Sequence, residues 1–183
     1  MKAGMPHQDL ASPCYPNANQ PEVIIWEQQS SSSPQGRSLT LTVGTTLARI
    51  TFSISPTTTK MHENGQVILY PLNKGKNQQW QFQDGYIINV ESGMCLGIRG
   101  TDEKDIKAGA LVVQGAKRTG SSSLLQLWVI NTIWGYITPW YPTSTPVALT
   151  GLNNTVASSA VAAVEPIDFS NVGQQWTLVN ASS

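Results

Sequence analysis

The chain has 183 residues with 11 basic and 11 acidic side chains, so its formal net charge at neutral pH is zero. Charged residues make up only 12% of the chain, well below the ~25% usual in soluble domains, whereas Ser, Thr, Gln and Asn account for 60 residues. A neutral surface releases few counterions from phosphates, which argues against nucleic acids and anionic membranes as partners. A hydrophobic content of 40% argues equally against a disordered chain.

The N-terminal residues carry no apolar run, and no stretch approaches the ~20 apolar residues that a transmembrane helix needs. We therefore expect a cytoplasmic protein, with no secretory signal and no membrane insertion. Its two cysteines are Cys14 and Cys95. Free thiols are the favoured interpretation, and a single Cys14–Cys95 disulfide is the alternative.

Residues 1–33 form a Pro-containing N-terminal arm, and residues 34–183 are predicted to form one domain. Within the arm, residues 22–26 have the composition of a β-strand. Two interpretations of this run stay open. It is either an extra strand packed on the domain or a displaced first strand of the domain.

A Gln-x-Trp motif occurs three times, and its tryptophans are 48 residues apart both times. In each copy the Gln, the Trp and a following apolar residue occupy every second position, which indicates that they share one face of a β-strand. The three pairs are Gln78 and Trp80, Gln126 and Trp128, and Gln174 and Trp176.

The surrounding sequence repeats with the motif, in units of about 36–84, 85–132 and 133–181. Each unit contains four short β runs separated by Gly, Pro, Ser, Asn or Asp, and no segment has a convincing helical period. An ungapped match aligns residues 65–70 with residues 109–114. The predicted fold class is therefore all-β, with three four-stranded repeats and pseudo-threefold symmetry.

Three such repeats are the architecture of a β-trefoil, and with the triple Gln-x-Trp motif residues 34–181 resemble the ricin-B-chain-like (R-type) lectins. The resemblance implies that Trp80, Trp128 and Trp176 lie in a shared core. It also implies that Gln78, Gln126 and Gln174 anchor the backbone through their amide groups.

The lectin family binds sugar through an acidic residue after the second strand's Leu, an aromatic residue ending the third strand, and an Asn directly before Gln-x-Trp. In repeat one the resemblance places these roles on Ser53, Tyr70 and Asn77, with Gln78 beside them. Ser53 departs from the pattern, because a hydroxyl cannot bridge two sugar hydroxyls as a carboxylate does. Glu63 and Asn64, just before the third strand, are candidates to replace it.

The other two repeats depart further from the family pattern, with Gly97, Gln114 and Leu125 in repeat two and Thr150, Glu165 and Gly173 in repeat three. Repeat three instead has four aromatic residues within eight positions, from Trp134 to Tyr141. Trp140 and Tyr141 are adjacent, so one of them is expected to face water. Trp140 is therefore a candidate for a glycan or partner site of independent origin, and filling of the barrel base is the alternative.

Catalysis finds little support, because neither histidine has metal-ligand spacing and no nucleotide or nucleophile motif occurs. We expect no enzyme activity, no cofactor and no metal. Residues 101–107 contain three carboxylates and two lysines. A solvated loop is the favoured interpretation of this run, and a cation site is the alternative.

The resemblance predicts a carbohydrate-binding lectin whose partners are glycans or glycoproteins, of the kind that fungi use in defence. Two alternatives remain open. One is a β-trefoil protease inhibitor acting through a surface loop, and the other is a non-catalytic module of a toxin or assembly. The sequence leaves the oligomeric state and the identity of the sugar open.

Overall fold

The computed structural model describes residues 23–28, 50–54, 63–73 and 75–180, which contain twelve β-strands and five short 3-10 helices. The strands of repeat one are β1 (Val23–Gln28), β2 (Ile50–Ile54), β3 (Gly65–Pro71) and β4 (Trp80–Gln83). Those of repeat two are β5 (Tyr86–Asn89), β6 (Cys95–Ile98), β7 (Ala110–Gly115) and β8 (Trp128–Asn131). Those of repeat three are β9 (Tyr136–Pro139), β10 (Val147–Gly151), β11 (Ala162–Pro166) and β12 (Trp176–Asn180).

The 3-10 helices lie in the connections between these strands. They are η1 (Lys76–Gln78), η2 (Glu103–Asp105), η3 (Gly120–Gln126), η4 (Leu152–Asn154) and η5 (Val172–Gln174). Three of them, η1, η3 and η5, end on the Gln of a Gln-x-Trp motif. Among the described residues no helix is long and apolar enough to cross a membrane.

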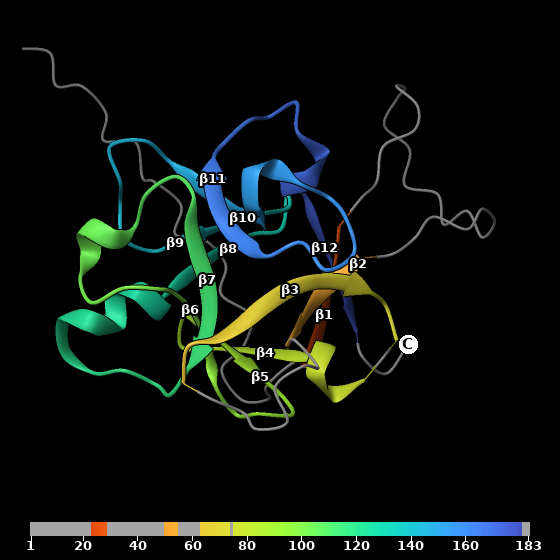
Figure 1. The fold of residues 1–183 in the computed structure, drawn as a ribbon, viewed down its shortest axis with the longest axis horizontal. Helices are drawn as coiled ribbons and strands as arrows, with labels where there is room; N and C mark the ends of the chain where they lie inside the picture. The colour runs from red at the N-terminus through yellow and green to blue at the C-terminus, as the bar shows by residue number, and fades with distance from the viewer. Residues whose placement is uncertain (1–22, 29–49, 55–62, 74, 181–183) are drawn as a thin grey trace, which may run out of the picture.

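The strand pairing repeats three times around the molecule. The second and third strands of each repeat form an antiparallel pair, and the last strand of each repeat pairs with the first strand of another, as β4–β5, β8–β9 and β12–β1. The third strands β3, β7 and β11 also contact one another in all three combinations, and Figure 1 shows them converging near the centre of the view. This closed pattern is the predicted β-trefoil.

Strand β1 completes the pattern for repeat one. It pairs with β12 from Ile24 to Gln28, and it also pairs with β2 and β4. Its position is that of β5 and β9 in the other repeats, so of the two interpretations left open, the pairing supports the displaced first strand. Strand β1 therefore pairs as part of the first repeat. The predicted boundary at residue 34 and the predicted start of the repeat near residue 36 lie outside the described residues.

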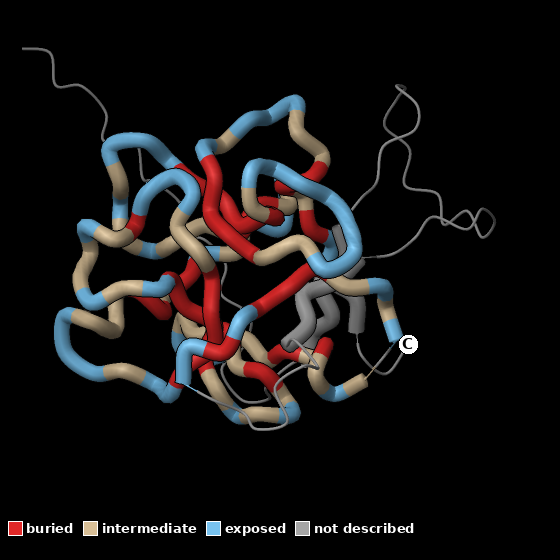
Figure 2. Tube along the Cα trace, in the orientation of Figure 1, coloured by how far each residue is buried: buried red, intermediate tan, exposed pale blue. Residues whose placement is uncertain are grey.

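The three motif tryptophans lie in the core, as predicted. Trp80, Trp128 and Trp176 are each at most 4% exposed, and they pack with apolar residues from all three repeats. The indole Nε1 of Trp128 donates to the carbonyl of Leu96 at 3.0 Å, and that of Trp176 donates to Leu149 at 2.9 Å. Figure 2 shows the buried segments along the inner strands, with exposed loops around them.

The three motif glutamines hold the backbone in the same way in every repeat, which confirms their predicted anchoring role. Each is at most 1% exposed. The side-chain Nε2 donates to a carbonyl at the end of the third strand, and Oε1 accepts from the amide two residues later. The partners are Pro71 and Asn73 for Gln78, Ala116 and Arg118 for Gln126, and Pro166 and Asp168 for Gln174, at 2.7–3.0 Å.

Cys95 is a buried, unpaired thiol on β6. Burial raises the pKa of this thiol, and the positive charge of Lys117 opposes the shift in part. A thiol kept protonated in this way is a poor nucleophile, so Cys95 acts as a small core residue. Cys14, the other half of the alternative disulfide, lies outside the described residues.

A tight backbone contact at the start of repeat three requires a glycine at position 135. Its φ is +74°, and a Cβ placed there would lie 3.0 Å from the carbonyl oxygen and 3.1 Å from the nitrogen of Trp176. We therefore expect Gly135→Ala to lower the free energy of unfolding by about 2–3 kcal/mol. The matched control is Gly93→Ala, at φ +68° with no atom within 4 Å, which should cost only about 1 kcal/mol. If urea denaturation gives the same loss of unfolding free energy for Gly135→Ala and Gly93→Ala, the contact with Trp176 is unimportant.

Candidate functional site

The glutamine anchors define which residues are equivalent in the three repeats. The residue before each accepting carbonyl is Tyr70, Gly115 or Glu165, so these three positions correspond. The left-handed turns before the third strands agree, with positive φ at Asn64, Gly109 and Ser159. The predicted match of Tyr70 with Gln114 was therefore wrong by one residue, and Gly115 takes that place in repeat two.

In repeat one the predicted residues come from three elements that meet at one corner of the barrel. Ser53 lies on β2, Tyr70 near the end of β3, and Asn77 in η1. Thr51 pairs with Tyr70 and Ser53 pairs with Ile68, so Ser53 and Tyr70 lie two positions apart along this strand pair. Strand β2 also contacts η1. Tyr70 and Asn77 are both half-buried, so each still reaches solvent.

Gln78 is not available at this corner. Its side chain is fully buried, and both ends of the amide group are bonded to the backbone, to Pro71 and Asn73. The prediction that Gln78 contacts sugar therefore disagrees with its burial. Its contribution to a site is indirect, because its hydrogen bonds hold the end of β3, and thus Tyr70, next to the segment that carries Asn77.

Glu63 and Asn64 do not replace the missing carboxylate. Both precede β3, whereas Tyr70 is near the far end of that strand, roughly 20 Å away at about 3.3 Å per residue. The carboxylate of Glu63 instead accepts from the amide of Ala116 at 2.7 Å, in repeat two. The repeat-one corner therefore recruits no acidic side chain from this loop.

The equivalent corner of repeat two is closed. A Cβ on Gly97 would lie 2.7 Å from Cγ of Gln126, and a Cβ on Gly115 would lie 2.6 Å from Oε1 of Glu63. Leu125, in the position of Asn77, is 1% exposed. Apolar packing and the Glu63 carboxylate thus fill the space that a ligand would need.

The corner of repeat three is closed by its own hydrogen bonds. Thr150 is fully buried, and its hydroxyl donates to the carbonyl of Gly173 at 2.9 Å. Glu165 is 7% exposed and accepts from the amide of Asn153 at 2.8 Å. Of the three equivalent corners, repeat one is the one in which the residue at the end of the third strand is an aromatic and, like the Asn before the motif, is partly exposed.

The aromatic cluster of repeat three is divided between core and surface. Trp140 is 56% exposed, whereas Tyr141 is half-buried and packs against the core, so the prediction that one of the two faces water is confirmed. Trp140 follows β9, where its amide donates to the carbonyl of Leu127. Trp134 is also exposed, at 64%, but it lies in the turn at the opposite end of the β8–β9 hairpin.

Two of the three carboxylates in the 101–107 loop serve as local caps. Asp102 accepts from the amide of Lys104, and Asp105 accepts from the amides of Thr101 and Asp102. These backbone donors hold the pKa of Asp105 below its usual range. In the part of the chain that the structure describes, no group of three or more His, Cys, Asp or Glu side chains could hold a metal ion.

Comparison with known proteins finds similarity at the level of structure. No protein-family model and no curated protein sequence matches the chain. Among solved structures, the Rhizoctonia solani agglutinin has a TM-score of 0.60 and 13% identity, over 91% of this chain and 99% of that one. An earthworm R-type lectin C-half solved with GalNAc has a TM-score of 0.60 and 10% identity, over 87% and 99%.

A third similar structure is the Macrolepiota procera ricin B-like lectin in complex with lactose. Its TM-score is 0.58 and its identity is 18%, over 90% of this chain and 99% of that one. At this level of identity the likeness concerns the fold. The chain therefore has a β-trefoil fold, and the solved structures that it resembles include ricin-B-like and R-type lectins.

Proposed function

We propose that the protein is a lectin, which binds carbohydrate reversibly through the corner of repeat one. The observation that carries the proposal is the difference between the three equivalent corners. Repeats two and three fill theirs with packed side chains and internal hydrogen bonds, whereas repeat one has Tyr70 and Asn77 there, both half-buried and therefore partly exposed. Similar structures that were solved with lactose and with GalNAc support the same class of ligand.

The chemistry of the corner suits a neutral sugar. A pyranose has an apolar C–H face, which packs on an aromatic ring such as Tyr70, and hydroxyl groups, which pair with an amide such as that of Asn77. The zero net charge of the chain adds no attraction for phosphate or sulfate groups.

The absence of a carboxylate at Ser53 limits the affinity. A carboxylate makes charge-assisted hydrogen bonds that are roughly twice as strong as neutral ones, and a serine hydroxyl does not replace them. We therefore expect a dissociation constant of about 1 mM for a monosaccharide. Useful strength then comes from longer glycans or from several copies of the protein on one surface.

A glycan array tests the proposal with the wild type and a Tyr70→Ala, Asn77→Ala double variant. We expect the wild type to bind neutral glycans, and the double variant to bind them at least ~10-fold more weakly, because it loses both the stacking surface and a hydrogen bond. The matched control is Trp140→Ala, which removes an exposed aromatic outside this corner and should bind like the wild type.

Each contrary result has a clear meaning. A wild type that binds no glycan overturns the lectin proposal, and a protease inhibition panel then tests the inhibitor alternative. A double variant that binds as well as the wild type removes the repeat-one corner as the site. A loss of binding in Trp140→Ala alone moves the site to Trp140.

A further inference from the structure

The threefold repeat provides an internal comparison for the hairpin turns that join the repeats. Between β4 and β5 the turn has two residues, Asp84 and Gly85, both with positive φ as tight hairpins require. Between β8 and β9 the turn has four, Thr132 to Gly135. This hairpin therefore contains two more residues than a tight connection needs.

The longer turn places apolar side chains at the surface. Ile133 is 86% exposed and Trp134 is 64% exposed. Hydrogen bonds to Asn131 close the turn: Oδ1 of Asn131 accepts from the amides of Ile133 and Trp134 at 3.1 and 3.0 Å, and the amide of Gly135 donates to the carbonyl of Asn131. The turn thus holds two adjacent apolar side chains at the surface, where they add nothing to the core.

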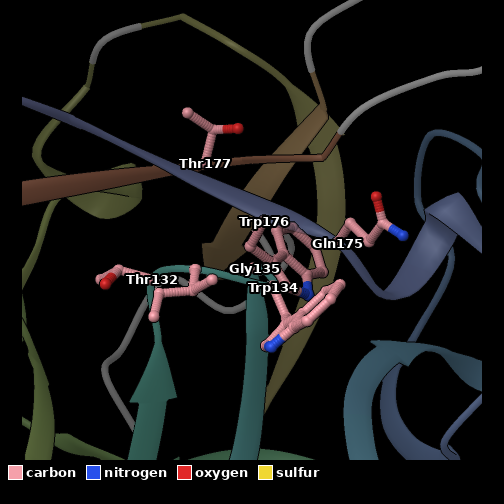
Figure 3. A pocket seen from close by; sticks show the side chains of 7 residues that line it. Thr132, Trp134, Gly135, Gln175, Trp176 and Thr177 are labelled. Carbon is pink, nitrogen blue, oxygen red and sulfur yellow. The ribbon is translucent and has the colours of Figure 1, made fainter. Parts of the chain in front are cut away.

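Beside this turn lies a cleft of about 160 Å³, which we call the Trp134 cleft. It is lined by the turn residues 132–135 and by Gln175, Trp176 and Thr177. Figure 3 shows the indole of Trp134 at the front, with Thr132 on one side and Gln175 on the other. The floor is formed where the Trp176 amide donates to the carbonyl of Gly135 at 2.7 Å.

The equivalent place in the preceding repeat is apolar. There the amide of Trp128 donates to the carbonyl of Gly85, and the residues flanking Trp128 are Leu127 and Val129. In the Trp134 cleft the flanking residues are Gln175 and Thr177. The side-chain amide of Gln174 is hydrogen-bonded to the backbone. The side chain of Gln175, in contrast, makes no hydrogen bond to any described residue.

We propose that the Trp134 cleft is a second carbohydrate site, unrelated to the repeat-one corner, which takes a single neutral sugar ring. Trp134 offers an aromatic face, and Gln175 offers an amide group that makes no hydrogen bond to any described residue. The lining includes no charged side chain, so nothing in the cleft favours a phosphate, sulfate or carboxylate group. The volume is below the ~300 Å³ typical of drug-sized ligands, which suits one ring on an exposed chain end.

The test is a titration of ¹⁵N-labelled protein with lactose, N-acetylgalactosamine and chitotriose, followed by the indole N–H signal of Trp134 and the amide signals of Gln175 and Thr177. We expect all three signals to move with at least one of the probes. Trp134→Ala should abolish the movement at Gln175 and Thr177. Gln175→Ala should weaken binding at the cleft about fivefold, the value of one hydrogen bond.

The same titration separates this site from the repeat-one corner. In the Tyr70→Ala, Asn77→Ala variant the Trp134 signals should still move. If sugar shifts only the NMR signals of Tyr70 and Asn77, the proposed function is supported and the Trp134 cleft is overturned as a site. If it shifts only the signals of the cleft residues, the cleft is supported and the repeat-one corner is overturned. No movement at Trp134 with any probe overturns the cleft as well. If sedimentation shows a dimer that Trp134→Ala converts to a monomer, with no sugar shift, the surface is a self-association face instead.

Discussion

Replacing Trp128 with Ala should lower the free energy of unfolding by about 3–5 kcal/mol, the range for large aromatic residues removed from protein cores. The indole is 2% exposed and packs in the core shared by the three repeats. The substitution also leaves the carbonyl of Leu96 without the hydrogen bond that it receives from Nε1. Since whole domains are stable by about 5–15 kcal/mol, this loss is a large fraction of the total. Urea denaturation followed by far-UV circular dichroism measures it.

The matched control for this core substitution is Trp134→Ala. It removes the same side chain from a surface position that is 64% exposed, so it should change stability by no more than about 0.5 kcal/mol. Similar losses in the two variants would contradict the placement of Trp128 in the core.

The second large effect is expected for Gln126→Ala, which should cost about 2–3 kcal/mol. The side chain is 1% exposed and makes two hydrogen bonds, to the carbonyl of Ala116 and from the amide of Arg118. Its loss leaves both backbone groups to find water, and it leaves a cavity at the end of β7. Thermal and urea unfolding of the variant measure the change.

Gln175→Ala is the control for this anchor, because the same residue type stands beside another anchor, Gln174, without anchoring the backbone itself. We expect it to change stability by no more than about 0.5 kcal/mol. If Gln126→Ala proves as mild as Gln175→Ala, the glutamine anchors are not the elements that fix the loops after the third strands.

The architecture could be predicted because three Gln-x-Trp motifs at equal spacing are too regular to arise by chance. Their core and anchoring roles are confirmed. The first strand was harder to assign, because residues 29–49 separate β1 from β2, whereas only residues 90–94 separate β5 from β6. The pairing of β1 with β12 is not visible in the spacing of the motifs.

The candidate sites could be predicted only in part. The one-residue error at Gln114 arose from matching Gly65 with Gly109, whereas the left-handed turn residues are Asn64, Gly109 and Ser159. Three different residue types serve the same backbone conformation, so their identities do not reveal the register. The aromatic cluster of repeat three was evident, but Trp134 stood out only once the four-residue turn between β8 and β9 was known.

The closure of the other two corners was likewise invisible in the sequence. Glu63 is separated from Ala116 by 53 positions, and only the pairing of β3 with β7 brings them together. Burial of Gln78 follows from its bonds to Pro71 and Asn73, which depend on the path of the chain after β3.

A crystal structure of the protein soaked with the neutral glycan that binds best on the array tests the central claim most directly. The account predicts a sugar ring against Tyr70 with a hydroxyl group within hydrogen-bonding distance of the Asn77 amide. It also predicts no sugar at the closed corners around Gly115 and Glu165. Sugar density at either closed corner, or none at Tyr70 while the glycan is bound elsewhere, would contradict it.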